Sequence, residues 1–148
     1  MAAQKCDYVI MEVPSEGQTQ YRHIGINYDM LVFTNVTKEL MAAHNFSLET
    51  LHKHNKRVFK KLFGSKRKNI NGKTIPKTIV ANIDNKYAKD YMAFKADNKI
   101  TFGTGQSDYQ LQNVKDTTDG ISFGINQDDY NVRILGKINS INDKIYFN

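Results

Sequence analysis

A run of basic residues is the feature of this sequence with the clearest chemistry. Residues 50–83 hold ten Lys and Arg side chains and no Asp or Glu. The segments before and after carry formal charges of −3 and −1, so the net charge of +6 is local to this run. Lys and Arg bind phosphate groups electrostatically, without reading base sequence. The run therefore predicts a nucleic-acid-binding surface, whose phosphate contacts are Lys53, Lys56, Arg57, Lys60, Lys61, Lys66, Arg67, Lys68, Lys73 and Lys77.

An internal repeat places two tyrosines at equivalent positions. Residues 100–114 align without gaps with residues 121–135, and the alignment pairs Tyr109 with Tyr130. Such rings stack on unpaired bases in single-strand binders, although aromatic residues at this spacing also serve as core. We predict these two tyrosines as stacking residues.

The same repeat places Asp108 opposite Asp129, which makes them the best candidates for Mg²⁺ ligands in a nuclease. Aspartate is also the residue that turns favour, because its side chain bonds to nearby amides. Gly72-Lys73-Thr74 resembles the end of a phosphate-binding P-loop, but Arg67 stands where the first glycine belongs. The four histidines lack the spacing of a zinc site. We therefore predict a non-catalytic protein without a cofactor, and keep a Mg²⁺-dependent nuclease as an alternative.

Charge alone does not separate nucleic acid from an acidic protein. A second hypothesis is a small inhibitor or a viral or phage accessory protein that docks an acidic partner through the same basic face. A third is a structural protein that oligomerises through the edges of its repeated hairpins. The high content of Asn and Lys is compatible with a phage or viral origin.

The basic side chains are expected on one amphipathic helix and the loop after it. Apolar residues with a period of 3.6 run from Leu48 to Phe63, Asn45 or Ser47 provides an N-cap, and Gly64 ends the helix. Residues 65–77 contain Gly and Pro and predict a basic loop.

Strands are expected on both sides of this segment. Before it we predict strands at Cys6–Val13, Tyr21–Ile26 and Met30–Thr34 and a short helix at Thr37–Ala43. After it come a strand at Thr78–Ile83, a short helix capped by Asp84 or Asn85, two related hairpins in the repeat, and a closing strand at Lys144–Phe147. The fold class predicted is α+β, with an antiparallel β-rich body (a meander or small barrel), a central amphipathic basic helix and a duplicated C-terminal hairpin.

The length of 148 residues predicts a single domain. Within it we distinguish N-terminal strands (1–36), the helical basic segment and loop (37–77), and the strand, short helix and repeated hairpins (78–148). The sequence holds one cysteine, no apolar run of about 20 residues and no signal peptide at its start. We therefore expect an intracellular protein with no membrane contact.

Overall fold

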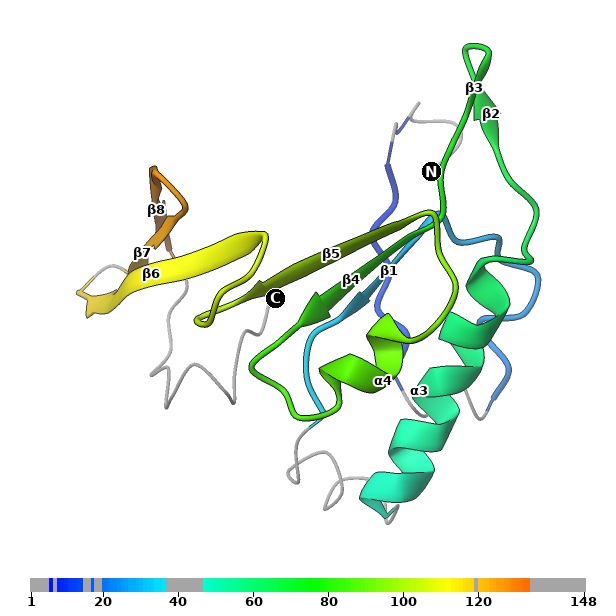
Figure 1. Ribbon diagram of the computed structural model, residues 1–148, viewed down its shortest axis with the longest axis horizontal. Coiled ribbons are helices and arrows are strands. Elements are labelled where there is room, and N and C mark those ends of the chain that lie inside the picture. The colour runs from blue at the N-terminus through cyan, green and yellow to red at the C-terminus, as the bar shows by residue number, and fades with distance from the viewer. Residues whose placement is uncertain are drawn as a thin grey trace.

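A computed structural model describes residue 6 and residues 8–14, 17, 20–36, 47–118 and 120–133. These residues form eight strands and two helices, labelled in Figure 1. In chain order they are β1 (Met30–Phe33), α3 (Leu48–Leu62), β2 (Asn69–Ile70), β3 (Lys73–Thr74), β4 (Thr78–Asn82), α4 (Ala88–Met92), β5 (Asn98–Gly103), β6 (Tyr109–Thr117), β7 (Gly120–Ile125) and β8 (Asp128–Val132).

Six of these strands form one mixed sheet in the order β1-β4-β5-β6-β7-β8. The pairs β1/β4, β4/β5 and β5/β6 are parallel, whereas β6/β7 and β7/β8 are antiparallel. The two remaining strands, β2 and β3, form a small hairpin between α3 and β4. Figure 1 shows β6, β7 and β8 extending away from α3 and α4, so the two described helices lie against the part of the sheet that holds β1 and β4.

The parallel pairing follows from where the helices stand in the chain. Helix α3 lies between β1 and β4, and α4 lies between β4 and β5. A helix that returns the chain to the starting end of the sheet makes the next strand parallel to the last. Strand–helix–strand order thus builds the α/β half of the molecule.

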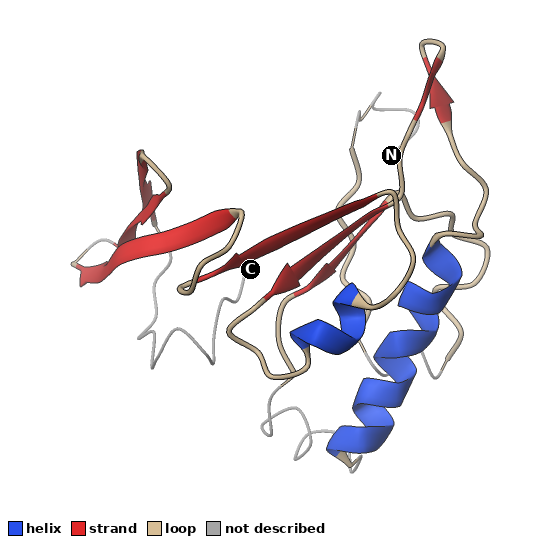
Figure 2. Cartoon of the chain, in the orientation of Figure 1, coloured by secondary structure: helices blue, strands red, loops and turns tan. Residues whose placement is uncertain are grey.

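The core lies between the two helices and one face of strands β1 and β4, and Figure 2 shows both helices on that side. Helix α3 begins after Ser47, whose Oγ accepts a hydrogen bond from the Thr50 amide at 3.2 Å. Tyr91 of α4 is fully buried, and its ring stacks on Phe33 with 3.9 Å between centroids. The buried apolar residues of this core are Leu31, Phe33, Val36, Val58, Phe59, Leu62, Ile79, Ala81, Ala88 and Tyr91.

The prediction of an antiparallel β-rich body is wrong, because the strands around the helices are parallel. Residues 20–25 form a turn in place of a strand, and no strand occurs in the described part of residues 6–13. The first repeat unit is not a hairpin, since β5 and β6 pair in parallel, whereas the second unit is a hairpin, since β7 and β8 pair antiparallel. The strands Met30–Phe33 and Thr78–Asn82 and the helix after Ser47 are confirmed. The predicted helix at 37–43 and strand at 144–147 lie outside the described residues.

Candidate functional site

The fold pairs part of the predicted basic surface with acidic residues from other parts of the chain. Lys56 Nζ lies 2.8 Å from Asp90 Oδ2. In the segment after α3, Arg67 forms an ion pair with Asp97, and Lys68 with Asp29. None of these carboxylates belongs to residues 50–83, so the absence of acids within the run does not leave these three cations unpaired.

Lys77 is the clearest departure from the prediction of a phosphate contact, because its side chain is completely buried. Its Nζ donates to the carbonyls of Tyr28 at 2.6 Å and Lys66 at 3.0 Å, and lies 3.5 Å from Asp29 Oδ1. An ammonium group has three donors, and these acceptors match that number. Lys77 thus joins the segment before β1 to the segment after α3 at the amino end of the sheet.

Asp97 extends this network to the start of β5. Its Oδ2 accepts a hydrogen bond from the Lys77 amide at 2.6 Å, and its carboxylate binds both terminal nitrogens of Arg67. The bonds from Arg67, and then the bond from the Lys77 amide, lower the pKa of Asp97 below its ordinary value. These ion pairs hold the amino ends of β1, β4 and β5 together, so Arg67, Lys68 and Lys77 have a structural role.

A second polar cluster joins α3 to α4. The His52 ring bonds to Asp90 Oδ2 through Nε2 at 2.8 Å and to the Tyr91 hydroxyl through Nδ1 at 3.1 Å. Hydrogen bonds from Lys56 and then His52 lower the pKa of Asp90, and burial raises the pKa of Tyr91. A His–Asp pair is also common in catalytic sites, but here both ring nitrogens are engaged within the helix packing.

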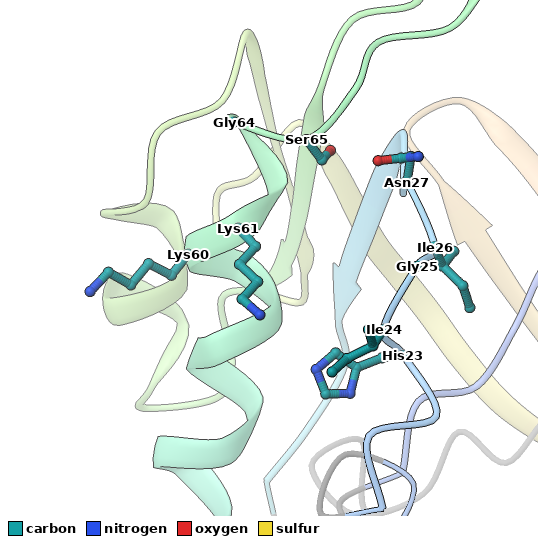
Figure 3. A pocket seen from close by; sticks show the side chains of 9 residues that line it. All are labelled: His23, Ile24, Gly25, Ile26, Asn27, Lys60, Lys61, Gly64 and Ser65. Atoms are coloured by element: carbon teal, nitrogen blue, oxygen red, sulfur yellow. The ribbon is translucent and has the colours of Figure 1, made fainter.

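The other six cations of the run have no ion pair with any described residue; they are Lys53, Arg57, Lys60, Lys61, Lys66 and Lys73. Two of them, Lys60 and Lys61, line an open cavity of about 440 Å³ between the end of α3 and residues 23–27 (Figure 3). His23 faces this space from the opposite wall. The cavity is a concave basic surface at the amino side of the sheet.

The carboxyl ends of parallel strands are where open α/β sheets place their ligands. In this chain that edge carries amide side chains. Asn35, just after β1, accepts hydrogen bonds at its Oδ1 from Asn82 at 3.4 Å and from Asn85 at 3.3 Å. Asn82 is only 5% exposed at the end of β4. The three amides form a connected polar group across the first two parallel strands.

Asp84 and Thr104 continue this edge toward β5. The Asp84 carboxylate accepts from the Thr104 amide at 2.8 Å and from the Thr104 hydroxyl at 3.0 Å. Gly103 has φ of +152°, and a Cβ there would lie 2.8 Å from Ile83 Cγ1 and 2.9 Å from Asp84 Oδ1. Only glycine therefore allows the close approach of these two loops.

The remaining predicted residues do not form a site in the structure. Asp108 Oδ2 accepts from the Thr101 amide at 2.8 Å and from its hydroxyl at 2.7 Å, and these bonds lower the Asp108 pKa. Asp129 lies on β8, and the described residues contain no group of three or more side chains suited to a metal ion. Tyr130 stacks on Phe123 with 5.7 Å between centroids, and it remains 44% exposed, as Tyr109 remains 51% exposed.

The Gly72-Lys73-Thr74 segment does not form a P-loop in the structure. Lys73 and Thr74 form β3, and with Gly72 they belong to the exposed β2–β3 hairpin, which has no helix at its end. This is not the strand–loop–helix arrangement that holds phosphate in a P-loop. Among the described residues, no helix is long and apolar enough to cross a membrane.

Comparison with known proteins gives a consistent result. Residues 1–143 match the Mur ligase middle domain family. The chain is 30% identical to UDP-N-acetylmuramoyl-L-alanyl-D-glutamate–2,6-diaminopimelate ligase 1 of Clostridium acetobutylicum over 147 residues, and 30% identical to the corresponding ligase of Bacillus cereus over 148. Each alignment covers 96% of this chain but only 27% and 29% of the relative. A solved structure of a UDP-N-acetylmuramoyl-L-alanyl-D-glutamate–2,6-diaminopimelate ligase superposes with a TM-score of 0.69 at 19% identity, covering 91% of this chain and 27% of that one.

These findings overturn the prediction of a non-catalytic nucleic-acid-binding accessory protein, with its nucleic-acid partner and its phage or viral assignment. The prediction depended on the charge of residues 50–83, and the sequence does not show which acidic residues the fold places beside these cations. It also missed Asn35, Asn82, Asn85 and Asp84. The signal for these residues was present, since each stands at the end of a strand or just after it, where the connection to a helix begins.

Proposed function

Because the chain belongs to the Mur ligase middle domain family, we propose that it forms the middle domain of a ligase that adds 2,6-diaminopimelate to UDP-N-acetylmuramoyl-L-alanyl-D-glutamate. The observation that carries this proposal is the family match over residues 1–143, together with relatives that bear this activity in their names. The chain spans less than a third of those relatives, so it would act with further domains. We propose residues 1–148 as a single domain, working inside the cell.

The face of the sheet that no described helix covers supports a role within a larger protein. Val32, Val80 and Ile100 are in register across β1, β4 and β5, on the face opposite to the described helices. Val32 is 53% exposed and its neighbour Met30 is 51% exposed. Parallel sheets are found almost only with both faces covered. This apolar face fits contact with another part of the ligase.

The carboxyl edge of the parallel strands is the part of this chain that we assign to substrate. Asn35, Asn82 and Asn85 provide amide donors and acceptors there, suited to the peptide and sugar groups of the precursor. The hydrogen bonds among them hold the three side chains in fixed positions before a ligand arrives. A pre-organised polar edge binds with a smaller loss of side-chain entropy.

Joining a carboxylate to an amine requires activation of the carboxylate, commonly by a nucleoside triphosphate. The Gly72-Lys73-Thr74 segment does not fit a triphosphate, because it is an exposed hairpin and not the start of a helix. We therefore derive no step of the reaction at a nucleotide from this chain. The proposal for these residues is limited to binding and orienting the precursor.

The test is a titration of the 148-residue chain with UDP-N-acetylmuramoyl-L-alanyl-D-glutamate, followed by backbone amide resonances in NMR. We expect saturable shifts at Asn35, Asn82 and Asn85. UDP-N-acetylglucosamine, which lacks the peptide, is the ligand control. Asn35→Ala is expected to weaken binding about tenfold, the effect of losing one hydrogen-bonding group and leaving its partners unpaired.

Asn69→Ala is the matched variant, since Asn69 is an exposed asparagine of the β2–β3 hairpin and lies outside the carboxyl edge. It should bind the precursor as the unchanged chain does. The assignment of substrate to the carboxyl edge would be contradicted if the resonance shifts were confined to residues outside this edge. It would also be contradicted if Asn35→Ala and Asn69→Ala bound the precursor equally well.

A further inference from the structure

The cavity beside the end of α3 has chemistry that the ligase assignment does not use. Its wall on one side is the last turn of α3, where Lys60 and Lys61 stand, and on the other side the turn that contains His23. It lies near the segment before β1, at the amino ends of the parallel strands, whereas Asn35 lies at their carboxyl edge. It is therefore a separate surface from the proposed substrate edge.

The basic groups around this cavity repel one another. Figure 3 shows the Lys61 side chain extending from the helix toward the His23 ring, whereas Lys60 points away from the cavity. Arg57 is four residues before Lys61, so both project from the same side of α3. Like charges at this spacing destabilise a helix. Neither side chain has an ion pair with a described residue.

The His23 ring also has an unsatisfied polar atom. Its Nδ1 is buried and has no hydrogen-bond partner among the described residues. Burial, then the charge of Lys61, then the charge of Arg57, lower the pKa of His23 below its ordinary value. The neutral form of its imidazole is therefore favoured, beside two cations that have no ion pair with a described residue. A neutral imidazole still has one N–H group with which to donate to an anion.

From this geometry we propose that the cavity binds a small phosphate group, held by the Lys61 ammonium and the His23 ring, with the charge of Arg57 one helical turn away adding to the attraction. A phosphate accepts hydrogen bonds on every oxygen, from an ammonium group and from an imidazole N–H alike. It neutralises the repulsion between Arg57 and Lys61 and favours protonation of His23. The cavity volume of about 440 Å³ leaves room for a phosphorylated small molecule.

The positive charges of Lys61 and Arg57 have to overcome one opposing effect. The cavity adjoins the carboxyl end of α3, where the helix dipole is negative. That dipole is equivalent to about half an elementary charge, whereas Arg57 and Lys61 each carry a full one. The net field in the cavity therefore favours an anion.

The test is a titration of the 148-residue chain with inorganic phosphate at pH 7, with sodium chloride adjusted to keep ionic strength constant. The readout is the His23 ring resonances in NMR, assigned by comparison with His23→Asn. We expect a saturable shift, and an upward shift of the His23 pKa in saturating phosphate. Acetate is titrated in parallel, and the proposal expects its binding to be at least threefold weaker.

Variants on the same helix separate a site from general attraction. Lys61→Gln should weaken phosphate binding about tenfold, as expected for loss of one charge-assisted hydrogen bond. Lys53→Gln removes an exposed cation near the start of α3 and should leave binding unchanged. Circular dichroism of both variants verifies that they fold.

The proposal is overturned if the His23 resonances show no saturable shift up to 20 millimolar phosphate, a concentration on the order of weak small-molecule binding. It is equally overturned if Lys53→Gln and Lys61→Gln lose affinity to the same extent, or if acetate binds as tightly as phosphate. These outcomes do not bear on the ligase proposal, whose test follows the precursor at the opposite edge of the sheet.

Discussion

The buried ammonium of Lys77 offers the most direct test of the structure. Lys77→Met retains a long apolar side chain but removes all three donors, so the carbonyls of Tyr28 and Lys66 lose their partner beside a fully buried position. Each unsatisfied group costs about 1–3 kcal/mol, and breaking a buried ion pair by removing one partner costs about 3–5 kcal/mol. Asp29 keeps its ion pair with Lys68, which limits the loss. We therefore expect the free energy of unfolding to fall by about 3 kcal/mol.

The assay is urea denaturation followed by circular dichroism, with linear extrapolation to water. Domains of this size unfold with about 5–15 kcal/mol, so a loss of this size moves the midpoint clearly. Lys73→Met is the control, because Lys73 lies on the exposed β3 and has no ion pair with a described residue. Its effect should stay within about 0.5 kcal/mol.

Should Lys77→Met fail to fold, Lys77→Gln provides a milder change, since its amide keeps donors for one of the two carbonyls. Equal stability of Lys77→Met and Lys73→Met would refute the reasoning. It would mean that Lys77 reaches solvent and that the amino ends of the strands are held by other contacts.

Two further predictions concern single residues at opposite edges of the sheet. Gly103→Ala should lower the free energy of unfolding, measured by urea denaturation, by about 2 kcal/mol, because the added Cβ would clash with Ile83 and Asp84. Gly64→Ala is the matched control, because a Cβ at Gly64 meets no atom within 4 Å, and it should not destabilise the fold. Equal losses of stability in the two variants would contradict the close approach of Gly103 to Ile83 and Asp84. Asp97→Asn should be less stable than the unchanged chain at pH 7. Because hydrogen bonds lower the Asp97 pKa in the fold, its ionised form contributes stability above the unfolded pKa of about 4, and this contribution is lost as pH falls. The difference between the two chains in thermal unfolding should therefore disappear toward pH 2, and a difference that does not change with pH would argue against the ion pair with Arg67.

Local elements could be predicted from the sequence. The helix after Ser47 depends on an N-cap and on apolar residues spaced along one face, and both are properties of neighbouring residues. The apolar runs of β1 and β4 likewise indicate strands without reference to the rest of the chain. The order strand, helix, strand, helix, strand was also readable, and it favours parallel pairing. The error lay in extending the C-terminal hairpin pattern, which is correct for β7 and β8, to the whole sheet.

By itself, the sequence determined the helix, several strands and the local excess of positive charge in residues 50–83. Only the tertiary structure decided what that charge does. The acids that pair with Lys56, Arg67 and Lys68 lie 30 to 39 residues away along the chain. Electrostatic energy depends on distance in space and on burial, and neither is visible in the order of residues. The amide side chains of the carboxyl edge are likewise far apart in the sequence, and they form one group because parallel pairing brings the ends of β1 and β4 together.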